Sequence, residues 1–284
     1  MPVIATLEPG RAAGSAIEKT GVYLYCFTRA DAVKGIKSPG IDDSQRVSGL
    51  RVKGIAAVFS RVPLREFVGD AARRHLENPA WVLPRACRHE WVVEEVMGRS
   101  PVLPVRFGSI FTSTRLLGEL LETKSWEISL FLELLSDKEE WSVKCFADLD
   151  QSRDWLLRSD PEFIEKRKHA PSIPGALYWH ERHLRLQADK KARQGWRAAA
   201  EQVCRALKDH AHKSCPLRLQ PRNVSGRREE MIYNCAFLLS RDSVANFQAR
   251  VESANAARRG QGITVELSGP WPPYNFCPSI AETS

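Results

Sequence analysis

Apolar side chains occupy every second position in residues 263–268. This period of two predicts a strand with one buried face. Pro270 follows, and because proline donates no hydrogen bond to a sheet, the strand is expected to end before it. The proline-rich residues 270–276 predict a stiff, extended segment that holds three aromatic side chains, including Trp271 and Tyr274, at little entropic cost.

The first half of the chain carries both strand and helix patterns. Residues 22–27 are apolar on both faces, which is typical of a central strand. In residues 102–111, Pro104 and Gly108 interrupt an apolar run and favour an edge strand or a bulge. The other predicted elements are strands in 49–62 and at 141–146, and helices that begin at Pro63, at Pro84 (running to Gly98) and at 113 (running to 136).

The second half opens on residues 158–174, whose prolines and charge run predict a domain boundary. A helical pattern then runs from 176 to about 211, bent near Gly195. Strands at 215–220 and 230–240, a helix over 243–260 and the strand 263–268 follow. The order predicts an α+β protein with two domains. These are an N-terminal ferredoxin-like sandwich (21–157) and a C-terminal domain (175–277) with a long helix on a small antiparallel sheet. The linker is 158–174, and the tails are 1–20 and 278–284.

Five ordered segments resemble one known family. The last of them is ELSGPWPPYNF at 266–276, and the others are VYLY at 22–25, LPVRFGSIF at 103–111, WSVK at 141–144, and Pro174-Gly175 followed by Tyr178. They are similar to the motifs of the gas vesicle GvpL/GvpF family, and the resemblance covers residues 21–277.

The resemblance implies a non-enzymatic protein of gas vesicle assembly. Its expected partners are the small, hydrophobic shell protein and other gas vesicle accessory proteins, and it is also expected as a minor vesicle component. A shell subunit with exposed apolar surface and strand edges aggregates unless a binding protein holds it. The resemblance implies no catalytic residue and no cofactor.

Composition is that of a globular protein, with 43% hydrophobic and 27% charged residues. No apolar run reaches membrane-spanning length, and residues 1–19 lack the pattern of a signal peptide. A cytoplasmic protein is expected. The seven cysteines are an odd number without a CxxC pair, which favours reduced thiols. The net charge of +8 is spread along the chain and predicts at most weak binding to nucleic acid.

Metal-ligand patterns fail on spacing. His89-Glu90 begins like HExxH, but Val93 stands where the second histidine is needed. The histidines 180 and 183 fail likewise, and Cys204, His210, His212 and Cys215 lack the tight thiol pair of a zinc knuckle. No nucleophile elbow or phosphate-binding loop occurs. We expect no metal and no cofactor.

Four residues are candidates for partner binding: Arg106, Phe107, Trp271 and Tyr274. Arg106 either clamps a partner's carboxylate or occupies the outward face of its strand. Trp271 and Tyr274, with Phe276, either anchor a partner or fold back over the core as a clasp between the domains.

Two other functions stay open. A ferredoxin-like sheet with a basic surface can bind RNA, which would need aromatic rings on an exposed sheet face. An enzyme of unrecognised type would need an activated nucleophile or an acid–base pair, and no motif supplies one.

Overall fold

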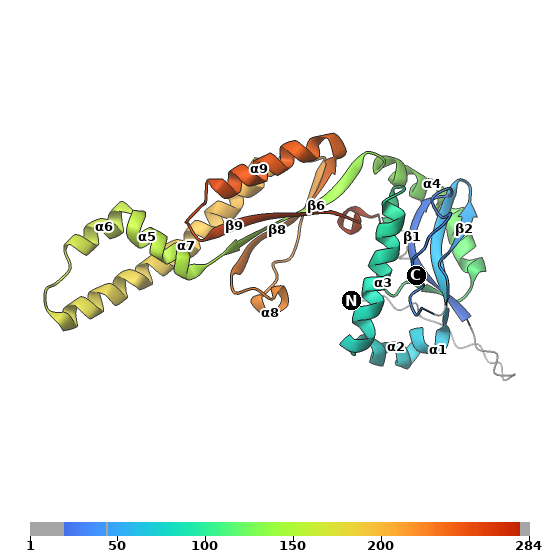
Figure 1. Ribbon diagram of the computed structural model, residues 1–284, viewed down its shortest axis with the longest axis horizontal. Coiled ribbons are helices and arrows are strands. Elements are labelled where there is room, and N and C mark those ends of the chain that lie inside the picture. Colours follow the sequence, from blue (N-terminus) through green and yellow to red (C-terminus); the bar gives the residue numbers. More distant parts are fainter. Residues whose placement is uncertain (1–19, 44, 279–284) are drawn as a thin grey trace. The chain divides into compact units, whose positions relative to one another are not determined.

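The structure is a computed structural model that describes residues 20–43 and 45–278. Apart from residues 20 and 278, the predicted tails lie outside the described residues. Contacts divide the chain into two compact units. Unit 1 comprises residues up to Asp137 together with those from Pro272 onward, and unit 2 comprises Lys138–Trp271. Each unit is described by itself (Figure 1).

Unit 1 is built on an antiparallel sheet in the order β2-β3-β1-β4, with β5 also paired to β1. The central strand predicted at 22–27 is confirmed, because residues 21–28 of β1 are all buried. The interrupted run at 102–111 forms two short pieces beside β1. The strands are β1 (Thr20–Arg29), β2 (Ser48–Val52), β3 (Ile55–Pro63), β4 (Val102–Pro104) and β5 (Ile110–Phe111).

Helices cover the sheet of unit 1 on both faces (Figure 1). Valines of α3 pack with Tyr23 and Tyr25 of β1 in one core cluster, while α4 contacts β1, β2 and β3. The amphipathic helix predicted over 113–136 is confirmed, with Ser113 as its N-cap. The helices are α1 (Leu64–Phe67), α2 (Gly69–Leu76), α3 (Pro79–Met97) and α4 (Thr114–Leu134).

Helix α3 starts earlier than predicted. The expected start at Pro84 is wrong, because Asn78 caps the helix through the amide of Ala80 and Pro79 occupies the first turn. Proline is favoured there, since the first amides of a helix have no internal acceptor. Pro84 lies inside the helix.

Unit 2 has the element order β-α-β-β-α-β of the ferredoxin-like fold, with sheet order β7-β8-β6-β9. Helices α7 and α9 pack in one core cluster with the sheet. The strands are β6 (Lys138–Ala147), β7 (Lys213–Pro216), β8 (Glu230–Ser240) and β9 (Ile263–Trp271). The helical elements are α5 (Leu149–Ser159), α6 (Pro161–Lys168), α7 (Pro174–Lys208), α8 (Arg222–Ser225), the short turn η1 (Arg241–Ser243) and α9 (Val244–Ala256).

The predicted α+β class with two sheet-based domains and a long helix is confirmed. Unit 1 has the same sheet order as unit 2, but between β1 and β2 the described residues 30–43 and 45–47 form turns and irregular structure in place of a helix. The complete ferredoxin-like topology is therefore in the C-terminal half, where the sequence analysis expected only a helix on a small sheet.

The units divide at residues 137/138 and 271/272, not in the expected linker 158–174. Strand β6 was assigned to the N-terminal domain, but it pairs with β8 and β9 and belongs to unit 2. The expected linker is largely helical. Asp160 accepts a hydrogen bond from the amide of Glu162 and Pro161 opens α6, so the Asp-Pro pair starts a helix where irregular structure was expected.

Helix α7 contains 35 residues, and at 1.5 Å per residue it is about 52 Å long. Its C-terminal half packs on the sheet through Val203 and Leu207. Its N-terminal half packs instead with α5 and α6 around Phe163. In Figure 1 these three helices form an arm that extends from the sheet of unit 2.

The C-terminal strand is longer than predicted. β9 continues through Gly269 and Pro270 to Trp271, which pairs with Glu140 beyond a register shift. The following segment is not extended throughout, because residues Tyr274–Phe276 form a short 3₁₀ turn, η2. The amide of Tyr274 donates to the carbonyl of Pro272 at 2.7 Å. The prolines thus lead into a turn, and the segment joins unit 1.

Candidate functional site

The C-terminal segment is anchored in unit 1 by the hydroxyl of Tyr274. This hydroxyl donates to Oε1 of Glu90 at 2.9 Å and lies 3.1 Å from Nε2 of His89. Both partners are on α3. Pro272 and Pro273 are buried, so the segment lies against unit 1 over several residues.

His89 is fully buried and uses both ring nitrogens. Nδ1 lies 2.9 Å from the hydroxyl of Tyr23, and Nε2 lies 3.1 Å from the carbonyl oxygen of Val105. A carbonyl can only accept, so Nε2 carries the proton and Nδ1 accepts from Tyr23. The hydroxyl of Tyr23 in turn accepts from the amide of Gly108 at 3.1 Å. Every member of this cluster is satisfied when the imidazole is neutral.

Electrostatics agree with that assignment. Burial lowers the pKa of His89 to about 4, against a smaller raising effect of the hydrogen bond with Val105. Burial likewise raises the pKa of the phenols of Tyr23 and Tyr274 and of the Glu90 carboxyl. His89, Tyr23 and Tyr274 therefore stay uncharged at the centre of the cluster. Neutral hydrogen-bonded groups are suited to joining buried chain segments.

The turn after β4 is attached to the same cluster. The amide of Val105 donates to the carbonyl of Tyr25, and Gly108 adopts a φ of +88°, which a side chain would strain. The ring of Phe107 lies edge-on to His89, with centroids 6.0 Å apart. Arg106 projects from the turn and is exposed.

Phe107 and Tyr274, which the sequence analysis singled out, therefore meet at His89, and Arg106 lies next to them. Trp271 is not part of this cluster. It ends β9 in unit 2, is 44% exposed, and donates from its indole to Oγ of Ser268. Sequence reasoning missed His89, which it considered only as a metal ligand.

One face of α3 carries an exposed apolar stripe that the sequence analysis did not single out as a candidate binding surface. Leu83 and Trp91 are 62% and 56% exposed, and Cys87 between them is exposed as well. The three positions are spaced by four residues and so share one face of the helix. Glu90, to which Tyr274 binds, lies on the adjoining turn. In the sequence, these apolar residues recur every four positions. Apolar residues that face a buried core show the same spacing, so the spacing alone does not reveal that this face is exposed.

The metal-ligand patterns do not assemble into sites. Within residues 20–43 and 45–278, no three His, Cys, Asp or Glu side chains are placed to share an ion. His180 instead uses Nε2 toward the carbonyl of Lys166 at 3.1 Å.

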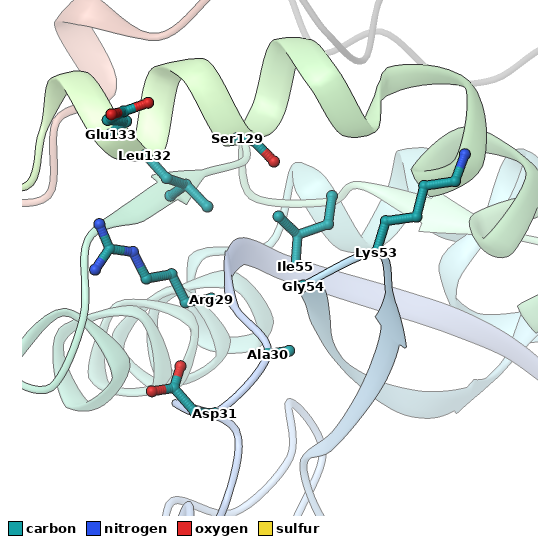
Figure 2. Close-up of a pocket in the computed structure, with 9 residues that line it drawn as sticks. All are labelled: Arg29, Ala30, Asp31, Lys53, Gly54, Ile55, Ser129, Leu132 and Glu133. Atoms are coloured by element: carbon teal, nitrogen blue, oxygen red, sulfur yellow. The ribbon is translucent and has the colours of Figure 1, made fainter.

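A surface hollow of about 550 Å³ lies in unit 1 between the end of β1, the β2–β3 turn and α4 (Figure 2). Its charged side chains are Arg29, Asp31, Lys53 and Glu133, two of each sign. Lys53 points away from the others in Figure 2 and pairs with Glu122 at 2.8 Å. The four charged groups do not point to one position, and their charges cancel, so the hollow does not define an ion site.

Fold and site together define a two-unit α+β protein whose buried polar cluster fastens its C-terminal segment to its N-terminal sheet. The family model described as "Gas vesicle synthesis protein GvpL/GvpF" matches residues 21–278, and the chain belongs to this family. It is a family of gas vesicle proteins and not an enzyme family.

Individual relatives span nearly the same length. The chain is 28% identical to gas vesicle protein L of Streptomyces sp. (strain CB03234) over 92% of this chain and 93% of that protein. It is 23% identical to gas vesicle protein F of Nostoc sp., over 90% of this chain and 98% of that one. The crystal structure of GvpF from Anabaena sp. PCC7120 has the same fold, with a TM-score of 0.63 and 20% identity over 93% of this chain and 97% of that chain. Within the described residues, none of the helices combines the length and apolarity that crossing a membrane requires.

Stability should depend on pH through His89. Its pKa is about 4 in the folded protein and about 6.5 in the unfolded chain. The unfolded chain therefore binds more protons between these values, so stability is lost as the pH falls below about 6.5. Between pH 7.5 and pH 5 this group alone should cost about 2 kcal/mol.

Urea denaturation of the natural protein and of a His89→Gln variant at both pH values measures this contribution. The difference in unfolding free energy between the two proteins should shrink by about 2 kcal/mol at pH 5. A difference that does not change with pH would mean that His89 is not held neutral.

Proposed function

We propose that the protein binds the small hydrophobic shell protein of gas vesicles through α3 of unit 1. The observation that carries this proposal is the exposed stripe of Leu83, Cys87 and Trp91. Large apolar side chains at helical spacing form a surface that suits the apolar face of a partner helix. Tryptophan is also a favoured anchor of protein interfaces.

The His89 cluster fixes the two chain segments that border the exposed face of α3. It fixes the C-terminal segment through Tyr274 and the turn through Val105, so that both border α3. Arg106, one residue beyond Val105, is then placed at the rim, where it can pair with a partner's carboxylate. In this proposal Phe107 and Tyr274 position the surface, and Arg106 contacts the partner. Trp271 is not required for it.

Binding of this kind would hold the shell protein apart from other copies until it is added to a vesicle. Exposed apolar surface drives association in water, and covering it on one subunit blocks that association. The same contact would allow the protein to remain on the vesicle as a minor component. We place this activity in the cytoplasm.

Replacing Leu83 and Trp91 together by glutamine should weaken capture of the shell protein at least tenfold, because each anchor of an interface can contribute 2 kcal/mol or more. Both side chains are largely exposed, so the melting temperature should hardly change. The measurement is co-purification of the tagged variant with the shell protein, in cells that lack the other accessory proteins.

Trp126→Gln is the matched control. Trp126 lies on α4 of the same unit and is 76% exposed, so the variant removes an exposed tryptophan elsewhere. It should retain full capture. If all three proteins capture the shell protein equally well, α3 is not the binding surface.

In the part of the chain that the structure describes, Trp271 at the end of β9 is the one exposed aromatic ring on a strand, and one ring is a poor stacking surface for RNA. Base stacking needs aromatic rings on an exposed sheet face. In unit 1 the rings of β1 are buried. In unit 2, Phe146 is only 3% exposed and lies beneath Arg227, whose guanidinium carbon is 4.2 Å from the ring centroid.

A further inference from the structure

A second cavity, of about 320 Å³, lies in unit 2 between α5, α7 and the end of α9. It is separate from the α3 surface of unit 1. Its lining is mainly apolar, with alanines of α7, Leu156 and Ile263, and two tryptophans, Trp155 and Trp196. Small-molecule sites in proteins combine such a lining with a few polar groups.

The tryptophan wall is rigid. Trp196 is 4% exposed and donates from its indole nitrogen to Oγ of Ser152 at 3.0 Å. That hydroxyl donates onward to the carbonyl of Gln261 at 2.8 Å. The indole donor is thus already used, and Trp196 offers the cavity a flat apolar face.

Gly195 of α7 lines the cavity and places no side chain in it. A Cβ built there would meet no atom within 4 Å. Glycine inside a helix costs about 0.5–1 kcal/mol relative to alanine. Residue 195 therefore lowers helix stability and leaves the cavity open.

Arg258 supplies the polar group of the cavity. It is 8% exposed, and its acceptors are all neutral: the carbonyls of Ala254 and Ala199 and Oε1 of Gln202. A guanidinium has five N–H donors, so two remain without an acceptor among the residues that the structure describes. Over the same residues, no Asp or Glu forms a salt bridge with Arg258. A buried charge without a counter-ion is costly, and a carboxylate would relieve that cost.

The other cation that lines the cavity is already neutralised. Nζ of Lys191 lies 2.8 Å from Asp160 and 3.0 Å from Glu162. An anion that enters the cavity therefore meets Arg258 as its unpaired cation.

We propose that this cavity binds a carboxylate carried on an apolar body about the size of one aromatic or branched aliphatic side chain. The apolar body lies against Trp155 and Trp196 in the space above Gly195, and the carboxylate accepts from the free donors of Arg258. A hydrogen bond from a guanidinium to a carboxylate is charge-assisted and stronger than one between neutral groups. A free arylalkanoic acid and the C-terminal residue of a polypeptide share this chemistry.

The test titrates the full chain with 3-phenylpropionate and with its amide by isothermal calorimetry. The acid should bind at least tenfold more tightly than the amide. A tetrapeptide that ends in phenylalanine, with a free or an amidated C-terminus, separates the two sources. If it binds more tightly than the free acid and loses affinity on amidation, the ligand is a chain terminus. If only the free acid binds, the ligand is a small molecule.

Three variants locate the binding. Arg258→Met should remove the preference for the acid over the amide, while Arg259→Gln, at the exposed neighbouring position, should leave it unchanged. A Cβ at residue 195 meets no atom within 4 Å, so Gly195→Leu should place its side chain in the cavity and abolish binding, while the melting temperature is kept or raised. This variant keeps the test valid even if Arg258→Met folds poorly.

Equal affinities for acid and amide, or binding that survives in Gly195→Leu, would overturn the proposal. So would the absence of heat from both acid and peptide at millimolar concentration. None of these outcomes bears on shell-protein capture by α3, which is measured separately.

Discussion

A His89→Ala protein is expected to lose about 3–5 kcal/mol of unfolding free energy, a large part of the 5–15 kcal/mol typical of a folded protein. The imidazole is fully buried, and its loss removes the donor to the Val105 carbonyl and the acceptor for the Tyr23 hydroxyl proton. Each buried polar group left unsatisfied costs about 1–3 kcal/mol, and the cavity adds to that cost. Urea denaturation at pH 7.5 measures the change.

Tyr274→Phe is the informative companion to this variant. It keeps the ring but removes the hydroxyl that bonds Glu90 and approaches His89. A cost of about 1–2 kcal/mol is expected, below that of His89→Ala. If Tyr274→Phe is the more damaging of the two, the C-terminal segment and not the imidazole is the centre of the cluster. If His89→Ala costs less than about 1 kcal/mol, the cluster is not holding unit 1 together.

Local periodicity predicted most elements of this fold. The central strand β1 has apolar residues on both faces, and α4 and α7 have long apolar stripes, so burial could be inferred from spacing. Periodicity does not say which sheet a strand joins. Strand β6 shows the limit, because its alternation indicates one buried face, and only its pairing with β8 and β9 assigns it to unit 2.

The His89 cluster could not be predicted in the same way. Its members are separated from His89 by 66, 16 and 185 residues, at Tyr23, Val105 and Tyr274. Spacing rules for metal ligands examine only neighbouring turns of chain, so they cannot detect a cluster of this kind. The segments that resemble the family motifs did contain three of the four members, and what sequence could not supply was the buried histidine that joins them.

Proline was the main source of error at boundaries. Pro79, Pro161 and Pro174 each occupy the first turn of a helix. Proline ends a helix or a strand elsewhere. Whether a proline indicates the start or the end of a helix therefore depends on whether the preceding residue adopts a capping conformation. Asn78 and Asp160 are such caps. Asn78 would have corrected the start of α3, and Asp160 would have corrected the linker at 158–174.

The arm of unit 2 depends on one aromatic side chain. Phe163 is 1% exposed and packs with Leu156 of α5 and with Leu184 and Ala188 of α7. Replacing it by alanine should destabilise the arm by about 3–5 kcal/mol, the usual cost of deleting a buried phenylalanine. The cluster is separate from the cores around the two sheets, so the loss should appear as local unfolding of α6 and of the first half of α7.

Hydrogen exchange read by mass spectrometry can resolve that local event. Amides of α6 and of the first turns of α7 should exchange far faster in Phe163→Ala, while those of β6 and β8 keep their protection. Ile164→Ala is the matched control, because Ile164 is the next residue on the same helix and is 38% exposed. It should cost much less, since the side chain gives up less buried area. Equal exchange in the two variants would mean that Phe163 does not hold the arm. A uniform loss of protection across unit 2 would mean that arm and sheet unfold as one cooperative body, and α7, which runs through both, would be the element that couples them.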